Sequence, residues 1–88
     1  MRDLDSIVRV LGQYEQRATY GAVAGVLGST ARTVMGRRAR SPFYSWVVNA
    51  STGMPTNYKP SECHPSLLAR SRVIDDATEL YHWLRDPR

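Results

Sequence analysis

Acidic residues are missing from the whole middle of this 88-residue chain, because none occurs between Glu15 and Glu62. That stretch nevertheless carries six basic residues: Arg17, Arg32, Arg37, Arg38, Arg40 and Lys59. The two ends of the chain together carry eight acidic and six basic residues. A solvated basic face without a partner is one explanation. The length of the acid-free stretch favours a polyanionic partner instead.

Other absences exclude whole classes of protein. The single cysteine, Cys63, excludes an intramolecular disulfide, so the expected compartment is the reducing cytoplasm. No apolar run approaches the length of a membrane span, and the N-terminus lacks a signal-peptide profile. One cysteine with His64 and His82 does not supply a closed zinc site. We therefore expect one domain over residues 1–88, a monomer without metal, cofactor, membrane contact or enzymatic activity.

The stretch from Thr19 to Arg40 has the pattern of two short helices separated by a tight turn. Gly28 is typical of a helix end, and Ser29 can cap the following helix. Along that second helix an apolar stripe is predicted on one side, made of Ala31, Val34 and Met35. The opposite side carries small and basic residues, namely Arg32, Thr33, Gly36, Arg37 and Arg40. This pattern predicts a helix-turn-helix that binds nucleic acid.

Upstream of this unit, apolar residues at helical spacing predict an amphipathic helix from Asp3 to Tyr14. We expect Glu15 to Ala18 to be a polar connector. Thr19 is the expected N-cap of the first helix of the helix-turn-helix, with Val23 and Leu27 facing inward.

Downstream, the aromatic and β-branched residues from Phe43 to Val48 predict a strand. Thr56 to Tyr58 could return as its partner after a turn, which would make a small hairpin. Pro65 to Arg70 is expected to form a short helical turn, and the tail from Val73 to Trp83 to pack back on the core. The predicted fold class is mainly α, a small winged-helix domain with a short β-hairpin wing.

Several stretches resemble, in order, the motifs of the O6-alkylguanine-DNA alkyltransferase family. Thr19-Tyr20-Gly21 is similar to its TYG motif, and Ala31-Arg32-Thr33-Val34 to the segment that opens its recognition helix. The remaining matches are Ser41-Pro42, Val47-Val48-Asn49 with Gly53, Asn57-Tyr58, and Leu67-Leu68-Ala69. The resemblance covers about residues 19–69.

This resemblance implies a winged-helix domain that binds double-stranded DNA through the minor groove and flips an alkylated guanine out of the duplex. Tyr20 would rotate the phosphate of the target nucleotide, and Arg32 would fill the gap left by the flipped base. The residues expected to bind DNA are Tyr20, Thr30, Ala31, Arg32, Thr33, Gly36, Arg37 and Arg40.

The sequence departs from the family at its active site. Alkyltransferases carry Pro-Cys-His-Arg-Val, whereas Tyr44, Ser45 and Trp46 occupy the cysteine, histidine and arginine positions here. A phenol without an adjacent base cannot replace a thiolate as alkyl acceptor. The chain thus resembles the alkyltransferase-like proteins, which mark lesions for nucleotide excision repair proteins. The expected lesion pocket contains Tyr44, Ser45, Trp46, Tyr58 and Lys59.

Three alternatives remain open at this point. The chain could be a winged-helix DNA-binding protein without a lesion pocket, with Tyr44 and Trp46 as ordinary packing residues. It could accept an alkyl group on Cys63, since Cys63-His64 repeats the catalytic dipeptide of the family. It could also be a protein-interaction module, because helix-turn-helix folds bind proteins as well.

Overall fold

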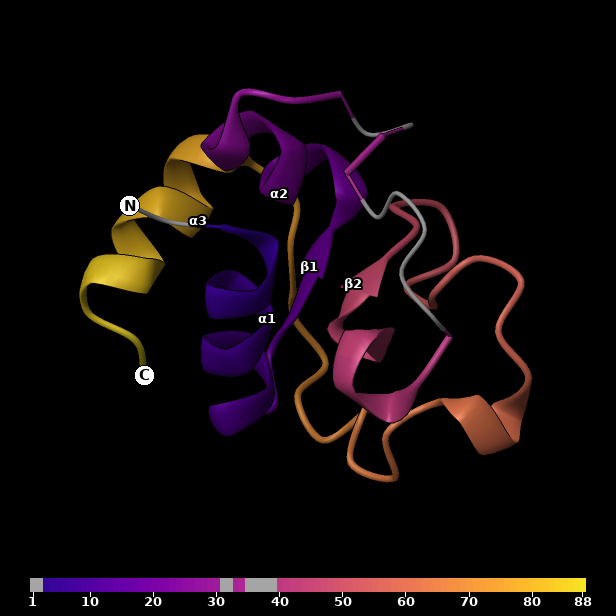
Figure 1. Cartoon of the computed structure of the whole chain (residues 1–88). Coiled ribbons are helices and arrows are strands. Elements are labelled where there is room, and N and C mark those ends of the chain that lie inside the picture. The colour runs from indigo at the N-terminus through magenta and orange to yellow at the C-terminus, as the bar shows by residue number, and fades with distance from the viewer. Residues whose placement is uncertain (1–2, 31–32, 35–39) are drawn as a thin grey trace.

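A short parallel sheet lies at the centre of the molecule in the computed structural model, which describes residues 3–30, 33–34 and 40–88 (Figure 1). Its strands are β1 (Arg17–Thr19), β2 (Val47–Val48) and β3 (Val73–Ile74), in the order β2-β1-β3. Both pairings of β1 are parallel: Ala18 lies opposite Val47 on one side and opposite Ile74 on the other. The expected polar connector, Glu15 to Ala18, therefore contains the first two residues of the central strand, and that prediction is wrong.

Helix α1 (Leu4–Gln13) confirms the predicted amphipathic helix. Asp3 caps it and forms a capping box with Ser6: the Ser6 N–H donates to Asp3 Oδ1 at 2.8 Å, and the Asp3 N–H donates to Ser6 Oγ at 3.1 Å. The bond from the Ser6 N–H is the main cause that lowers the pKa of the Asp3 carboxyl. The buried residues of α1 occur at the predicted helical spacing and form one side of the core: Leu4, Ile7, Val8 and Leu11.

Helix α2 (Tyr20–Leu27) follows β1 directly and has the predicted ends. Thr19 Oγ1 accepts the Ala22 N–H at 3.1 Å, and Gly28 closes the helix with a φ of 69°. The expected second helix, and with it the cap by Ser29, involves residues 31–32 and 35–39, which lie outside the described residues. Of that segment, Val34 is buried and Thr33 is exposed.

The predicted hairpin is wrong. Pro42–Trp46 forms the 3₁₀ helix η1, which leaves only Val47–Val48 as a strand, and that strand pairs with β1. Proline suits the first position of a helical turn, and the Ser45 hydroxyl donates to the Pro42 carbonyl at 2.7 Å. The residues from Thr56 to Tyr58 form a turn, in which Asn57 has a φ of 61°. Such a backbone conformation is incompatible with a continuous strand.

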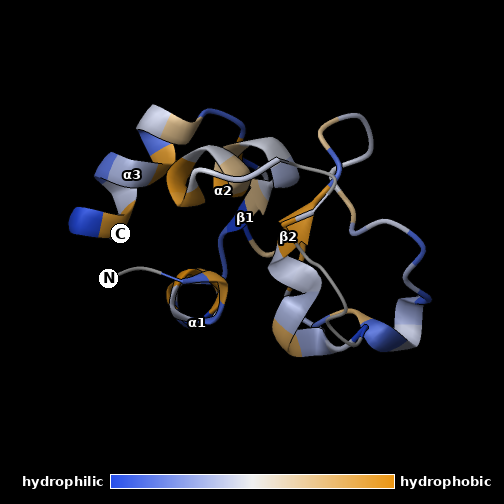
Figure 2. Ribbon diagram, turned by 45° about the horizontal axis from the view of Figure 1, so that its top comes forward, coloured by the Kyte–Doolittle hydropathy of each residue, from blue (hydrophilic) through white to orange (hydrophobic). Residues whose placement is uncertain are grey.

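The C-terminal part of the chain closes the fold on the other side of β1. Pro65 to Arg70 forms isolated turns instead of the expected helical turn, and η2 (Pro60–Glu62) precedes it. Helix α3 (Ala77–Arg85) packs against α2, and its Leu80 is buried as predicted, whereas Tyr81 is 47% exposed. Figure 2 shows β2 in hydrophobic colours between the helices and the loops.

The described chain is thus a small domain of three α-helices around a small three-stranded sheet. In Figure 1, α1 and α3 lie to the left of β1 and α2 lies above it, whereas most of the segment between β2 and β3 lies to the right. None of the helices in the described part is long and apolar enough to cross a membrane.

Candidate functional site

A pocket of about 320 Å³ opens in the segment between β2 and β3. This volume falls at the lower end of the range of about 300–1,000 Å³ that is typical of small-molecule sites. Most of its walls are apolar, and three are prolines. The lining residues are Met54, Pro55, Tyr58, Pro60, Cys63, His64, Pro65, Leu67 and Leu68.

Arg17 anchors both ends of the segment that builds this pocket. Its guanidinium donates from Nη1 to the Gly53 carbonyl at 2.7 Å and from Nη2 to the Arg70 carbonyl at 3.0 Å. A longer bond of 3.3 Å reaches the Ser71 carbonyl. The planar guanidinium can hold several acceptors at once in fixed directions. One side chain of the central strand therefore fixes the backbone just before and just after the pocket.

The surroundings of Arg17 also correct its role in the predicted basic surface. The side chain is only 6% exposed, and the acceptors it reaches are backbone carbonyls. Its Nε has no hydrogen-bond partner within the described part of the chain. This cation supports the fold and is not available to a polyanion.

Two tyrosine hydroxyls connect the pocket to its neighbours. Tyr20 begins α2, and its hydroxyl accepts the Thr56 N–H at 2.9 Å. The Tyr58 hydroxyl accepts the Ser41 N–H at 3.3 Å, and burial raises the pKa of Tyr58 above its usual value. The two residues that the resemblance assigns to DNA distortion and to the lesion pocket are therefore tied to the same short loop.

The structure separates Ser45 and Trp46, which were expected in the pocket, from Tyr58. Trp46 is 1% exposed and Ser45 is fully buried, so neither presents a surface to a ligand. Ser45 Oγ accepts the His64 N–H at 3.0 Å, and the Trp46 ring lies against the His64 ring with centroids 4.9 Å apart. These two side chains lie behind the pocket wall and support it.

Tyr44 points toward α1 instead of the pocket loop. Its hydroxyl donates to Asp5 Oδ1 at 2.9 Å, and its ring makes an edge contact with Phe43. Sequence reasoning failed here because it treated the segment as a strand, whereas the 3₁₀ turn changes which side chains share a face.

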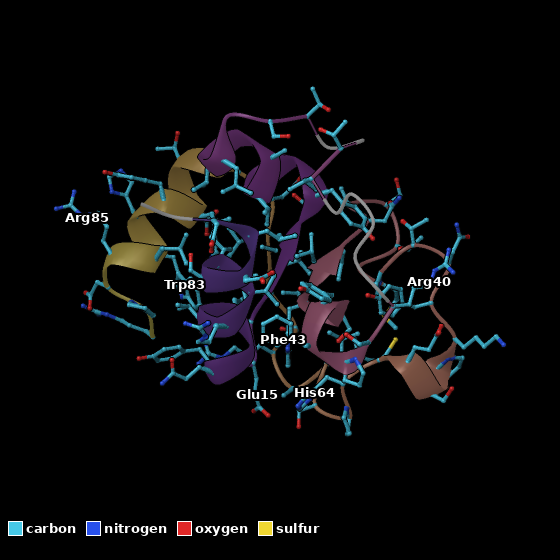
Figure 3. All side chains as sticks on the ribbon, in the orientation of Figure 1. Glu15, Arg40, Phe43, His64, Trp83 and Arg85 are labelled. Atoms are coloured by element: carbon cyan, nitrogen blue, oxygen red, sulfur yellow. The ribbon has the colours of Figure 1, made fainter. Side chains whose placement is uncertain are left out.

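The exposed polar residues of the predicted DNA surface are only partly described. Arg40, Thr30 and Thr33 are exposed, and the Thr30 and Thr33 hydroxyls lie 2.9 Å apart. Lys59, expected in the lesion pocket, is also exposed and does not line the pocket. In Figure 3, Arg40 is on the side of the pocket segment, whereas Trp83 and Arg85 are on the opposite side with α3. The other predicted DNA-binding residues, Ala31, Arg32, Gly36 and Arg37, lie outside the described residues.

Cys63 and His64 lie together in the pocket wall. The Cys63 thiol points toward the Lys59 carbonyl, with a Sγ–O distance of 3.7 Å. Burial, and secondarily the Glu62 carboxylate, raise the pKa of this thiol. A raised pKa reduces the thiolate fraction, which is the nucleophilic form. This environment disfavours Cys63 as an alkyl acceptor.

Sequence reasoning placed only Tyr58 and Lys59 of this region in the pocket. The apolar wall was not predicted, and His64 was considered only in the catalytic dipeptide and as part of an incomplete zinc site. The available signal was the dense run of prolines, Pro55, Pro60 and Pro65, among isolated apolar residues. Proline restricts the backbone, so such a run can build a rigid wall without regular secondary structure.

Neither a group of metal-binding side chains nor a match to a known protein identifies a function for this site. Within residues 3–30, 33–34 and 40–88, no group of three or more His, Cys, Asp or Glu side chains could hold a metal ion. No protein-family model, no curated protein and no solved structure matches the chain.

Proposed function

We propose that this protein is a non-catalytic DNA-binding protein that recognises O6-alkylguanine by minor-groove binding and base flipping. In this proposal its fold is a variant of the alkyltransferase-like winged-helix domain, and the bound lesion is presented to repair proteins. The proposal rests on the resemblance over residues 19–69 together with the pocket.

The observation that carries the proposal is the contact between Tyr20 and the loop that contains Thr56 and Tyr58. A base flipped out of a duplex needs a pocket close to the side chain that rotates its phosphate. The 2.9 Å bond from the Thr56 N–H to the Tyr20 hydroxyl brings the start of α2 to the loop that carries Tyr58. Tyr58 in turn lines the 320 Å³ pocket.

The charge distribution supports a DNA partner. The described residues 16–30, 33–34 and 40–61 carry no acidic side chain that would repel phosphate. Exposed Arg40 and Lys59 lie in these ranges. Since Arg17 is buried, however, most of the positive charge for DNA would come from Arg32, Arg37, Arg38 and Arg40.

The competing function is a DNA-binding protein without lesion recognition. The burial of Ser45 and Trp46 favours it, because these residues then cannot contact a flipped base. The two functions differ in one measurable property, which is the preference for alkylated over normal guanine.

The test is binding to a labelled duplex with guanine or O6-methylguanine at its centre, at two salt concentrations. We expect at least about tenfold tighter binding to the modified duplex, equivalent to about 1.4 kcal/mol. The variant Arg32→Ala should lose this preference. Arg9→Ala makes the same charge change at an exposed position of α1 and should retain the preference. Equal binding of the unmodified protein to both duplexes would leave only the competing function.

A further inference from the structure

The polar groups of the pocket differ in what they can offer a ligand. Three lining side chains carry heteroatoms other than methionine sulfur: Tyr58, Cys63 and His64. The Cys63 thiol is directed to the Lys59 carbonyl. The Tyr58 hydroxyl uses a lone pair to accept the Ser41 N–H, so its own proton remains available. These bonds leave the pocket with hydrogen-bond donors inside an apolar wall.

His64 is the donor whose ring is most firmly held. Its Nδ1 accepts the Ser66 N–H at 3.0 Å, so the neutral ring carries its proton on Nε2. Its backbone N–H is fixed by buried Ser45, and its ring lies against Trp46. None of the hydrogen bonds among the described residues uses Nε2.

Trp46 is itself packed from behind, so the ring that His64 contacts is held in place. A Cβ atom on Gly12 would come within 2.9 Å of Trp46 Nε1, so α1 packs directly on the indole. A donor held in one orientation before binding loses little conformational entropy when it forms a hydrogen bond.

We infer that His64 reads the base in this pocket by donating a hydrogen bond from Nε2 to an acceptor atom on the base edge. The inference rests on the proposed function and assigns to the pocket a class of ligand: bases whose exposed edge carries acceptors. In guanine, N1 carries a proton and is itself a hydrogen-bond donor, so it cannot pair with the donors of His64 and Tyr58. Alkylation at O6 removes that proton, so N1 becomes an acceptor beside O6.

The inference explains how a pocket without a nucleophile could favour the alkylated base. A buried donor that faces another donor leaves both unsatisfied, which disfavours binding more strongly than a single hydrogen bond favours it. Selectivity would then come from the rejection of normal guanine as well as from contact with the alkyl group.

A matched pair of substitutions isolates the donor. Both His64→Phe and His64→Gln lose the Nδ1 acceptor, but glutamine retains an N–H donor near the position of Nε2. We expect His64→Phe to reduce the preference for O6-methylguanine over guanine by about tenfold, the effect of losing one buried hydrogen bond. We expect His64→Gln to recover most of it. His82→Phe, at the other histidine and at an exposed position of α3, should retain the full preference.

The outcomes separate this inference from the proposed function. If the unmodified protein shows no preference for O6-methylguanine, the proposed function fails and the role of His64 fails with it. If the preference exists but is unchanged in His64→Phe, or is lost equally in both variants, only the role of His64 is overturned.

A second measurement does not depend on the folding of variants. In ¹⁵N-labelled protein, the His64 Nε2–H signal should shift and become protected from solvent exchange on addition of the O6-methylguanine duplex. A duplex with an abasic site at the same position should produce neither change. Identical signals with both duplexes would contradict a hydrogen bond from His64 to the base.

Discussion

Arg17 shows, at the scale of one residue, that a charged side chain can stabilise the fold in a chain whose other arginines are candidates for DNA binding. Its guanidinium is buried, and its two Nη groups donate to backbone carbonyls from two distant segments. Burial of a cation costs free energy, which several hydrogen bonds to carbonyl dipoles offset. The chain uses this arrangement where a short sheet alone could not hold a long loop segment.

We expect Arg17→Met to lower the free energy of unfolding by about 2–3 kcal/mol, because the Gly53 and Arg70 carbonyls lose their donors. Urea denaturation followed by circular dichroism measures this change. Arg9→Met, at an exposed position of α1, should change it by no more than about 0.5 kcal/mol. Equal effects of the two substitutions would show that the bonds of Arg17 contribute nothing.

The environment of Cys63 predicts a slow, pH-dependent thiol. Because burial and Glu62 raise its pKa, the thiolate fraction at neutral pH is lower than for a free cysteine, and it increases as the pH rises. Alkylation by iodoacetamide should therefore be slow at pH 7 and accelerate toward pH 10.

Substitution of the neighbouring carboxylate tests the cause of that slow reaction. Glu62→Gln removes the negative charge next to Cys63 and should increase the alkylation rate at pH 8, whereas Glu79→Gln on α3 should not.

Mass spectrometry after incubation with O6-methylguanine DNA should show no added methyl group. A methylated Cys63 would overturn the non-catalytic proposal.

At the scale of elements, glycine determines how closely α2 and α3 approach. A Cβ atom built on Gly25 would lie 2.4 Å from the Ala77 Cβ, which is closer than two carbon atoms can approach without a shift of the backbone. On the same helix, a Cβ atom on Gly21 would come no closer than 4.0 Å to Thr19 Oγ1. The two glycines of α2 thus have opposite tolerance for a methyl group.

We expect Gly25→Ala to destabilise the protein by about 1–3 kcal/mol through overpacking. Gly21→Ala should stabilise it by about 0.5 kcal/mol, because alanine loses less backbone entropy in a helix. Thermal denaturation of the two variants provides the comparison. If both substitutions shift the melting temperature in the same direction, the close contact between α2 and α3 does not determine stability.

Helices α1 and α2 of this protein could be predicted from the sequence, whereas two of its strands could not. Helix α1 depends on a local signal, the helical spacing of Leu4, Ile7 and Leu11. The ends of α2 depend on the capping residues Thr19 and Gly28. Both predictions are confirmed. Strands β1 and β3 are too short to show a periodic pattern, and their pairing joins residues far apart in the chain. No local signal encodes such contacts.

The candidate site was harder to predict for a related reason. Tyr58 was found through a motif, whereas His64 and the proline wall come together only when Arg17 and the two tyrosine hydroxyls fix the loop. Trp46 was misplaced because aromatic residues favour both strands and buried helical turns, and Pro42 decided in favour of the turn.

At the scale of the whole molecule, exposed arginines lie on two opposite sides of the protein. Arg40 lies on the side of the pocket segment and Arg85 on the side of α3, as Figure 3 shows. The C-terminal part that includes α3 also carries Asp75, Asp76, Glu79 and Asp86, which reduce its attraction for DNA. A duplex bound by this protein should therefore lie against the pocket side.

Charge reversal on the two sides tests this orientation. Arg40→Glu should weaken binding to any duplex and reduce the slope of log affinity against log salt by about 1 or more, as expected for a lost phosphate contact. Arg85→Glu makes an identical change in net charge and should have a much smaller effect. Equal losses in the two variants, measured by fluorescence anisotropy, would contradict a DNA site on the pocket side.

The central position of β1 has a consequence for how the protein is made. During synthesis Arg17 to Thr19 leaves the ribosome before both neighbouring strands and before the carbonyl acceptors of Arg17, and the last of these residues is Ile74. Helices α1 and α2 can form locally, whereas the sheet must wait until Ile74 has been made. The nascent protein therefore passes through a long period with an unpaired strand, and completion of the sheet and closure of the pocket should occur together as one late, cooperative step.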